Sequence, residues 1–348
     1  MDRRMMICSM AATAIVTPLA AFAQGEVKAR IGWLAVGPIP SNMAAFRAAM
    51  QRRGYVEGQN LVIQERYAGT VEQYRQQIAD LIRFKVDVLV TTGGVASHAA
   101  KLATDKIPIV FLTTDPVESG LVASLARPTG NLTGLAILTQ DFNAKRVETI
   151  VGMVPRITKL AALNDGSGAL SLSIQRAFWE ESEAAARRFG VLLAPKIEAR
   201  SIDDVDGAFT AAVKAGAGAM LTVSSSYFNT QKKGLVSAAA RARLPTIYEH
   251  RDFVEAGGLV SYGPNLRNAF DLAASYVDKI LKGTEPANLP VEQVSKVELV
   301  INQGTARTLQ LAIPQSLLLR ADEVIQSQIG RTAPLARWGP LRLSFRSP

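Results

Sequence analysis

The chain has 348 residues, of which 48% are apolar and 6% aromatic, and its formal net charge at pH 7 is +9. A chain of this length buries most of its surface and usually divides into two domains, and this composition suits an aliphatic α/β interior. The single cysteine, Cys8, lies in a segment that we expect to be removed, which excludes disulfides and thiolate metal ligands from the mature chain. The basic balance does not indicate a nucleic-acid partner, because no lysine-rich helix and no interleaving of aromatic and basic residues accompanies it.

The first 23 residues have the pattern of a secretory signal peptide. Arg3 and Arg4 precede an uncharged apolar run over 5–19, and the segment 21–23 (AFA) supplies a small-x-small cleavage site before Gln24. The run is shorter and more polar than a membrane span, which needs roughly 20 residues. We therefore predict export with cleavage after Ala23. The arginine pair is also compatible with a twin-arginine signal, which leads to the same compartment.

Short apolar strands then alternate with amphipathic helices. The first set has predicted strands at 31–35, 61–65, 86–90, 107–112 and 132–138, and predicted helices at 43–53, 71–84 and 95–104. The second set has predicted strands at 160–163, 191–194, 219–223, 246–248 and 259–261, and predicted helices at 143–154, 170–189, 205–213 and 230–241. Continuous apolar strands separated by helices indicate parallel sheets covered on both faces.

Two such α/β sheets predict two lobes with a cleft between them. We expect the helix at 268–281 to return to the first lobe and the strand at 297–301 to belong to the second, so that three crossings form a hinge. The predicted lobes are 28–137 plus 264–287 and 138–263 plus 288–328. The remainder, 329–348, carries four arginines and no acid, and its Pro and Gly residues predict a basic flexible tail.

The inventory of reactive groups disfavours an enzyme and a metal or cofactor site. The chain has two histidines, no His-x-x-His or His-Glu-x-x-His motif and no carboxylate-rich calcium spacing. The nucleophile-elbow pattern Gly-x-Ser-x-Gly does not occur. The segment 166–168 (GSG) lacks the third glycine of a dinucleotide fingerprint and is interpreted as a turn.

Candidate ligand-binding residues follow the strands of the first set. Thr91, Thr92 and Gly93 lie where a predicted strand ends and a helix begins, so free N–H groups, hydroxyls and the positive end of a helix dipole converge there. Such a place accepts a carboxylate. The neighbouring strand ends in the same way at Thr113, Thr114 and Asp115, and this acid suits an ammonium or hydroxyl on the ligand. Both segments are also compatible with ordinary N-caps.

Further candidates follow the strands of the second set. Tyrosines at strand ends would give flat walls for an aromatic or amphipathic small molecule, and an acid among them would bind an ammonium. Packing at the domain edge and a surface salt bridge are the alternative interpretations. The residues are Asn164, Ser224, Tyr227, Tyr248, Glu249 and Tyr262.

Several motifs in order along the chain resemble one family. They lie at 54–60 (GYVEGQN), 115–117 (DPV), 120–122 (GLV), 124–128 (SLARP), 130–134 (GNLTG), 252–258 (DFVEAGG), 261–265 (SYGPN), 276–283 (YVDKILKG) and 299–302 (LVIN). Together, over roughly 30–325, they resemble the ABC-transporter substrate-binding protein family that includes tryptophan/tyrosine-type binding proteins.

This resemblance implies a type I periplasmic-binding-protein fold, with two Rossmann-like lobes, three hinge strands and closure around one small ligand. It implies a monomer without a cofactor that hands an amino-acid-like or aromatic carboxylate to an ABC permease in the inner membrane. Cys8 lacks a lipobox, which favours a periplasmic protein over a lipoprotein. A sensor module for a membrane receptor or kinase would need the same cleft, so the sequence leaves that alternative open.

Overall fold

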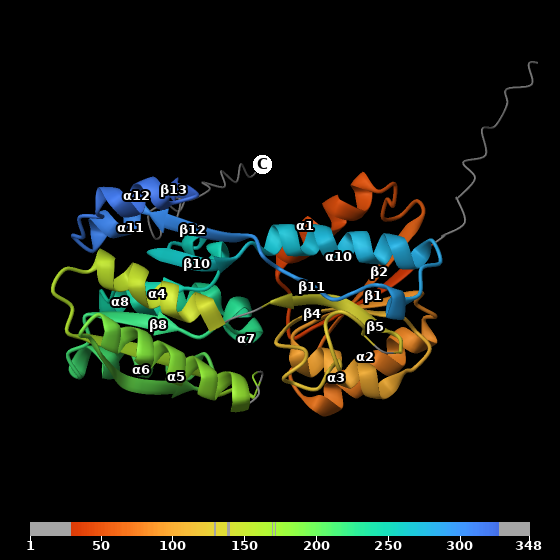
Figure 1. The fold of residues 1–348 in the computed structure, drawn as a ribbon, viewed down its shortest axis with the longest axis horizontal. Helices are drawn as coiled ribbons and strands as arrows, with labels where there is room; N and C mark the ends of the chain where they lie inside the picture. Colours follow the sequence, from red (N-terminus) through yellow and green to blue (C-terminus); the bar gives the residue numbers. More distant parts are fainter. Residues whose placement is uncertain (1–28, 129, 138–139, 169, 171, 327–348) are drawn as a thin grey trace, which may run out of the picture.

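The computed structural model describes residues 29–326, apart from positions 129, 138, 139, 169 and 171. Within these residues the chain forms two α/β lobes, each built on one sheet (Figure 1). The predicted signal peptide at 1–23 and the predicted basic tail at 329–348 lie outside the described residues. In the described part of the chain, no helix has the length and apolar character that a membrane crossing requires.

The first sheet has six parallel strands in the order β11-β5-β4-β3-β1-β2. They are β1 (Ala29–Ala35), β2 (Leu61–Tyr67), β3 (Val88–Thr92), β4 (Ile109–Thr114), β5 (Leu132–Ile137) and β11 (Glu292–Gln293). Its helices are α1 (Pro40–Arg52), α2 (Val71–Arg83), α3 (Gly94–Ala103) and α10 (Leu266–Leu281), with the short 3-10 helix η1 (Pro286–Asn288) before β11.

Helices cover both faces of this sheet because alternate strand residues point in opposite directions. Trp33 of β1 packs against Phe46 of α1 and Phe270 of α10, with ring centroids 5.3 and 5.5 Å apart. The next residue, Leu34, lies in the separate core under α2 and α3, together with Ile78. Burial on both faces explains why the strands are continuous apolar runs.

The second sheet has seven strands in the order β13-β12-β10-β9-β8-β6-β7, and only the β10–β12 pair among the described strands is antiparallel. The strands are β6 (Lys159–Asp165), β7 (Leu192–Ala199), β8 (Ala219–Thr222), β9 (Thr246–Tyr248), β10 (Val260–Pro264), β12 (Val297–Asn302) and β13 (Glu323–Ile325). The helices are α4 (Gln140–Met153), α5 (Leu172–Arg188), α6 (Asp203–Lys214), α7 (Ser226–Thr230), α8 (Lys232–Ala242), α9 (Arg251–Glu255), α11 (Gln303–Thr308) and α12 (Gln315–Arg320).

The chain passes between the lobes from β5 to α4, from β10 back to α10, and from β11 to β12 (Figure 1). The predicted fold class, two parallel-dominated α/β lobes joined by a three-strand hinge, is confirmed. The predicted boundary that places all of 288–328 in the second lobe needs correction. Glu292 of β11 pairs instead with Leu135 of β5, and Val291 and Val294 are buried in the first lobe. A two-residue edge strand has no periodicity that a sequence pattern can reveal.

Candidate functional site

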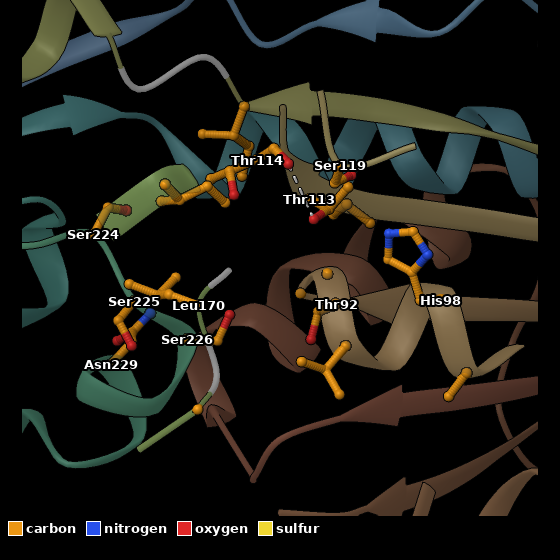
Figure 2. Close-up of a pocket in the computed structure, with 18 of the residues that line it drawn as sticks. Thr92, His98, Thr113, Thr114, Ser119, Leu170, Ser224, Ser225, Ser226 and Asn229 are labelled. Atoms are coloured by element: carbon orange, nitrogen blue, oxygen red, sulfur yellow. Dashed lines mark hydrogen bonds between the residues drawn. The ribbon is translucent and has the colours of Figure 1, made fainter. Parts of the chain in front are cut away.

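A cavity of about 580 Å³ lies between the two lobes. The first lobe lines it with the ends of β3 and β4 and with the N-terminal parts of α1 and α3. The second lobe lines it with the segments that follow β6, β8 and β9 (Figure 2). Ligands of open α/β sheets bind outside the carboxyl ends of the strands, and small-molecule pockets commonly measure about 300–1,000 Å³. Both the position and the volume therefore suit one small ligand.

Hydroxyl groups and a helix N-terminus form the wall of the first lobe. Thr92 ends β3, and Thr113 and Thr114 end β4, all three at the cavity (Figure 2). Helix α3 begins at Gly94 with Gly93 as its N-cap, and no side chain caps it. The first N–H groups of a helix have no partner within the helix, and they carry the positive end of its dipole. This wall is suited to an anion.

Gly93 has a backbone conformation that essentially only glycine adopts, with φ 90° and ψ 152°. A Cβ atom at this position would lie 3.1 Å from Oγ of Ser226, which belongs to the second lobe. Elsewhere across the cleft, the hydroxyl of Ser41 in α1 donates a hydrogen bond to the carboxylate of Asp252 in α9. The two lobes are thus in contact around the cavity.

The wall of the second lobe is also rich in hydroxyls. Ser224, Ser225 and Ser226 follow β8, and Asn229 of α7 lies beside them (Figure 2). The side chain of Ser225 caps α7, and its hydroxyl donates a hydrogen bond to the buried carboxylate of Asp165 at the end of β6. The position of Ser225 is therefore fixed by Asp165 and by the N-terminus of α7.

A second carboxylate lies behind the same serine. Glu249, which follows β9, is 1% exposed, and its carboxylate accepts hydrogen bonds from the N–H of Ser225 and the hydroxyl of Thr222, each at 3.4 Å. Such long bonds compensate weakly for lost hydration. Burial consequently raises the pKa of Glu249 to about 7.

One buried cation accompanies these acids. Arg146 of α4 is 1% exposed; its Nη1 donates to the carbonyl of Thr222 at 3.0 Å and its Nη2 to Oδ1 of Asn143 at 2.9 Å. Burial lowers the pKa of Arg146 to about 10, and the charge of Glu249 opposes that shift. Arg146 remains cationic at neutral pH, and its charge in turn limits the rise in the pKa of Glu249.

The cavity itself contains little formal charge. Among its described lining residues there is no Lys or Arg, and the single carboxylate, that of Glu118, is exposed. His98 and His250 also line it, and burial lowers the pKa of both imidazoles, that of His250 to about 4. The other lining side chains are mainly aliphatic or neutral and polar. Ligand charges would therefore meet helix N-termini, hydroxyls and the carboxylates behind Ser225.

The structure places five of the sequence-predicted residues in the lining: Thr92, Gly93, Thr113, Thr114 and Ser224. They meet there because each follows a parallel strand, and the carboxyl ends of these strands face the cleft.

Two other predicted residues are buried beneath the cavity wall. The hydroxyl of Thr91 is 2.9 Å from that of Ser97 in α3, since alternation along β3 turns it away from the cleft. The amide of Asn164 donates to Gln175 at 3.0 Å, and its carbonyl accepts from the N–H of Asp165. Both side chains form hydrogen bonds within their own lobe, and neither lines the cavity as predicted.

The predicted tyrosine walls also need correction. Tyr248 is fully buried in the second lobe and stacks on Phe253, with ring centroids 4.8 Å apart. Tyr262 packs edge-on against Phe142 at 6.3 Å, and Tyr227 packs on the core of the second lobe. These rings have apolar neighbours from helices that the local sequence does not reveal.

The two predicted acids lie outside the described lining as well. Asp115 has a left-handed backbone, with φ 42°, in the loop after β4. Glu249 lies behind Ser225, so it can act on a ligand only through the field of its charge or through that serine. The lining also contains His98, Ser119, Ser225, Asn229 and His250, which are not among the predicted site residues. For His98 a signal existed, because it lies one helical turn after Gly94 and so shares its helix face.

Comparisons with known proteins agree with this architecture. The family model described as ABC transporter substrate binding protein matches residues 40–325. A tyrosine-binding protein of Clostridioides difficile (strain R20291) is 27% identical over 270 residues, which cover 76% of this chain and 75% of that protein. A conserved domain protein from Vibrio cholerae superposes with a TM-score of 0.76 at 27% identity, covering 85% of this chain and 99% of the other. An ABC domain from Streptococcus pneumonia in complex with L-Trp gives a TM-score of 0.75 at 24% identity, with the same coverage.

The chain therefore belongs to the ABC transporter substrate-binding protein family. The resemblance inferred from the motifs is confirmed. Members of this family are binding proteins rather than enzymes, which confirms the prediction of a non-enzymatic chain. They bind small molecules, work with ABC permeases and are typically extracytoplasmic.

Proposed function

We propose that this chain is the extracytoplasmic solute-binding component of an ABC importer and that it captures a small, zwitterionic, aromatic amino acid between its lobes. The observation that carries this proposal is the polarity of the cavity. An uncapped helix N-terminus faces it from one lobe, and buried carboxylates stand behind the serines of the other.

The ligand carboxylate would bind at the first lobe. The free N–H groups at Gly94 and the following residues, together with the hydroxyl of Thr92, supply donors there. No basic side chain is needed, because an anion at a helix N-terminus is stabilised by aligned N–H dipoles. Charge-assisted hydrogen bonds of this kind contribute about 1.5–3 kcal/mol each.

The ligand ammonium would face the second lobe. Ser224 and Ser225 line the cavity there, and the buried carboxylate of Asp165, which accepts the hydrogen bond of the Ser225 hydroxyl, favours a cation on this side. The charge of Glu249 is balanced by that of Arg146. The aliphatic remainder of the lining, with Phe270, suits an apolar aromatic side chain. The binding of tyrosine by the Clostridioides difficile relative supports this class of ligand.

Calorimetric titration of the purified protein tests this function. We expect L-tryptophan or L-tyrosine to bind with a stoichiometry of one, and we expect the corresponding amine that lacks the carboxylate to bind at least about tenfold more weakly. A polyol such as myo-inositol serves as the negative control. Binding of the amine and the amino acid with equal affinity would show that the N-terminus of α3 is not a carboxylate site.

The proposal includes export to the periplasm, and it includes a monomeric state. Export is tested at the N-terminus of the mature protein. N-terminal sequencing of the protein recovered from the periplasm should begin at Gln24, since the AFA segment at 21–23 precedes it. A mature protein that retains Met1 would refute the export signal.

A further inference from the structure

His98 lies at the first-lobe end of the cavity, on the same face of α3 as Gly94 and one turn further along. Figure 2 places its ring beside Ser119 and Thr113, away from the serines of the second lobe. The side chain is half-buried. Its surroundings are otherwise largely apolar, since Val95, Ala99 and Leu102 of the same helix also line the cavity.

The ring is oriented by the loop that follows β4. Figure 2 shows the ring beside Ser119, and the backbone of this residue acts on the pKa of the imidazole. Lys101, one turn along α3, ties the same loop to the helix, because its ammonium donates to the carbonyls of Gly120 at 3.0 Å and Leu121 at 2.9 Å. The imidazole therefore sits against a fixed segment.

The protonation state of His98 follows from the same surroundings. Burial lowers its pKa, and the neighbouring charge of Lys101 lowers it further. A neutral imidazole has one N–H donor and one acceptor nitrogen. The backbone of Ser119 opposes the fall in the pKa, as a carbonyl that accepts the imidazole N–H does, and the other nitrogen is then the acceptor.

We propose that His98 is a specificity-determining residue, whose acceptor nitrogen binds an O–H or N–H donor at the far end of the ligand's aromatic side chain. This inference rests on the proposed function, with the amino-acid head between Gly94 and Ser225 and the ring extending towards His98. A ligand that carries a phenol or an indole N–H satisfies the acceptor. L-phenylalanine leaves it desolvated and unpaired, and a site built for a hydrogen bond discriminates strongly against such an analogue.

The test compares ligands that differ only in the donor. The native protein should bind L-tyrosine about ten- to a hundredfold more tightly than L-phenylalanine or 4-fluoro-L-phenylalanine, which has a group of similar size but no donor. In His98→Leu the preference should fall to about one, mainly because the affinity for tyrosine falls. His98→Gln, which keeps an acceptor, should restore part of the preference.

The comparison of ligands on the native protein tests the role of His98 even if a variant folds poorly. Equal binding of tyrosine and 4-fluorophenylalanine, or an unchanged preference in a folded His98→Leu, would overturn the role of His98 and leave the proposed function standing. If none of tyrosine, tryptophan and phenylalanine binds, the proposed ligand class is wrong, and so is this inference.

Discussion

Replacing Arg146 with methionine should lower the free energy of unfolding by about 3–5 kcal/mol at pH 8, the usual consequence of leaving a buried charge without its partner. Methionine fills much of the arginine volume but donates no hydrogen bond. The carbonyl of Thr222 and Oδ1 of Asn143 would each lose a donor, and Glu249 would lose its buried cation.

The effect should depend on pH in a defined direction. Folding raises the pKa of Glu249 from its ordinary value to about 7, so the folded chain holds this proton at a pH where the unfolded chain has released it. The contribution of this carboxyl to stability therefore falls as the pH rises from about 4.5 through about 7. Without Arg146 the pKa of Glu249 should rise further, so this fall should continue to a higher pH and the variant should lose less stability at pH 5.5 than at pH 8.

Urea denaturation of both proteins at the two pH values measures these differences. Arg188→Met, at an exposed position at the end of α5, is the matched control and should change stability by less than about 0.5 kcal/mol at either pH. A loss that is the same at pH 5.5 and 8 would mean that Arg146 does not act as the counter-charge of Glu249.

The second large effect is expected from Gly93→Ala. Its φ of 90° with ψ of 152° strains any residue that has a Cβ, and the strain costs on the order of 1–3 kcal/mol. The new methyl group would also lie 3.1 Å from Oγ of Ser226 across the cleft. Closure of the lobes around a ligand should therefore be impaired, and we expect affinity for the aromatic amino acid to fall about ten- to a hundredfold.

Gly58→Ala separates strain from closure. Gly58 also has a positive φ, 82°, but a Cβ there would meet no atom within 4 Å, and the residue is not among those that line the cavity. Both variants should lower the melting temperature, whereas only Gly93→Ala should weaken binding in a calorimetric titration. If the two variants bind the ligand equally well, Gly93 is merely a turn residue.

Much of the fold is predictable from the sequence because each structural element leaves a local pattern. The apolar runs at 86–90 and 107–112 and the helical spacing at 268–281 correspond to β3, β4 and α10. The exceptions are short elements, which include the helices α7, α9, α11 and α12 and the edge strand β11. β11 has two residues, and it joins the first sheet because its backbone pairs with β5.

The site is less predictable, because the direction of a side chain depends on distant neighbours. Thr92 and Thr113 were found from their place at strand ends, which the topology alone brings to the cleft. The place of Glu249 after a predicted strand indicates a residue that faces a ligand. It is held behind Ser225 instead, beside Arg146, which lies about a hundred residues earlier in the chain. Such a pairing leaves no trace in the sequence around either residue.

Native mass spectrometry is the most direct test of the central claim, that the chain captures one small molecule between its lobes and does not transform it. The protein, isolated without refolding and incubated with L-tyrosine and L-tryptophan, should gain the mass of one of them. Denaturation should then release that ligand chemically unchanged. A released compound of altered mass would indicate turnover, and the absence of any complex with either amino acid would contradict the proposed capture of an aromatic amino acid.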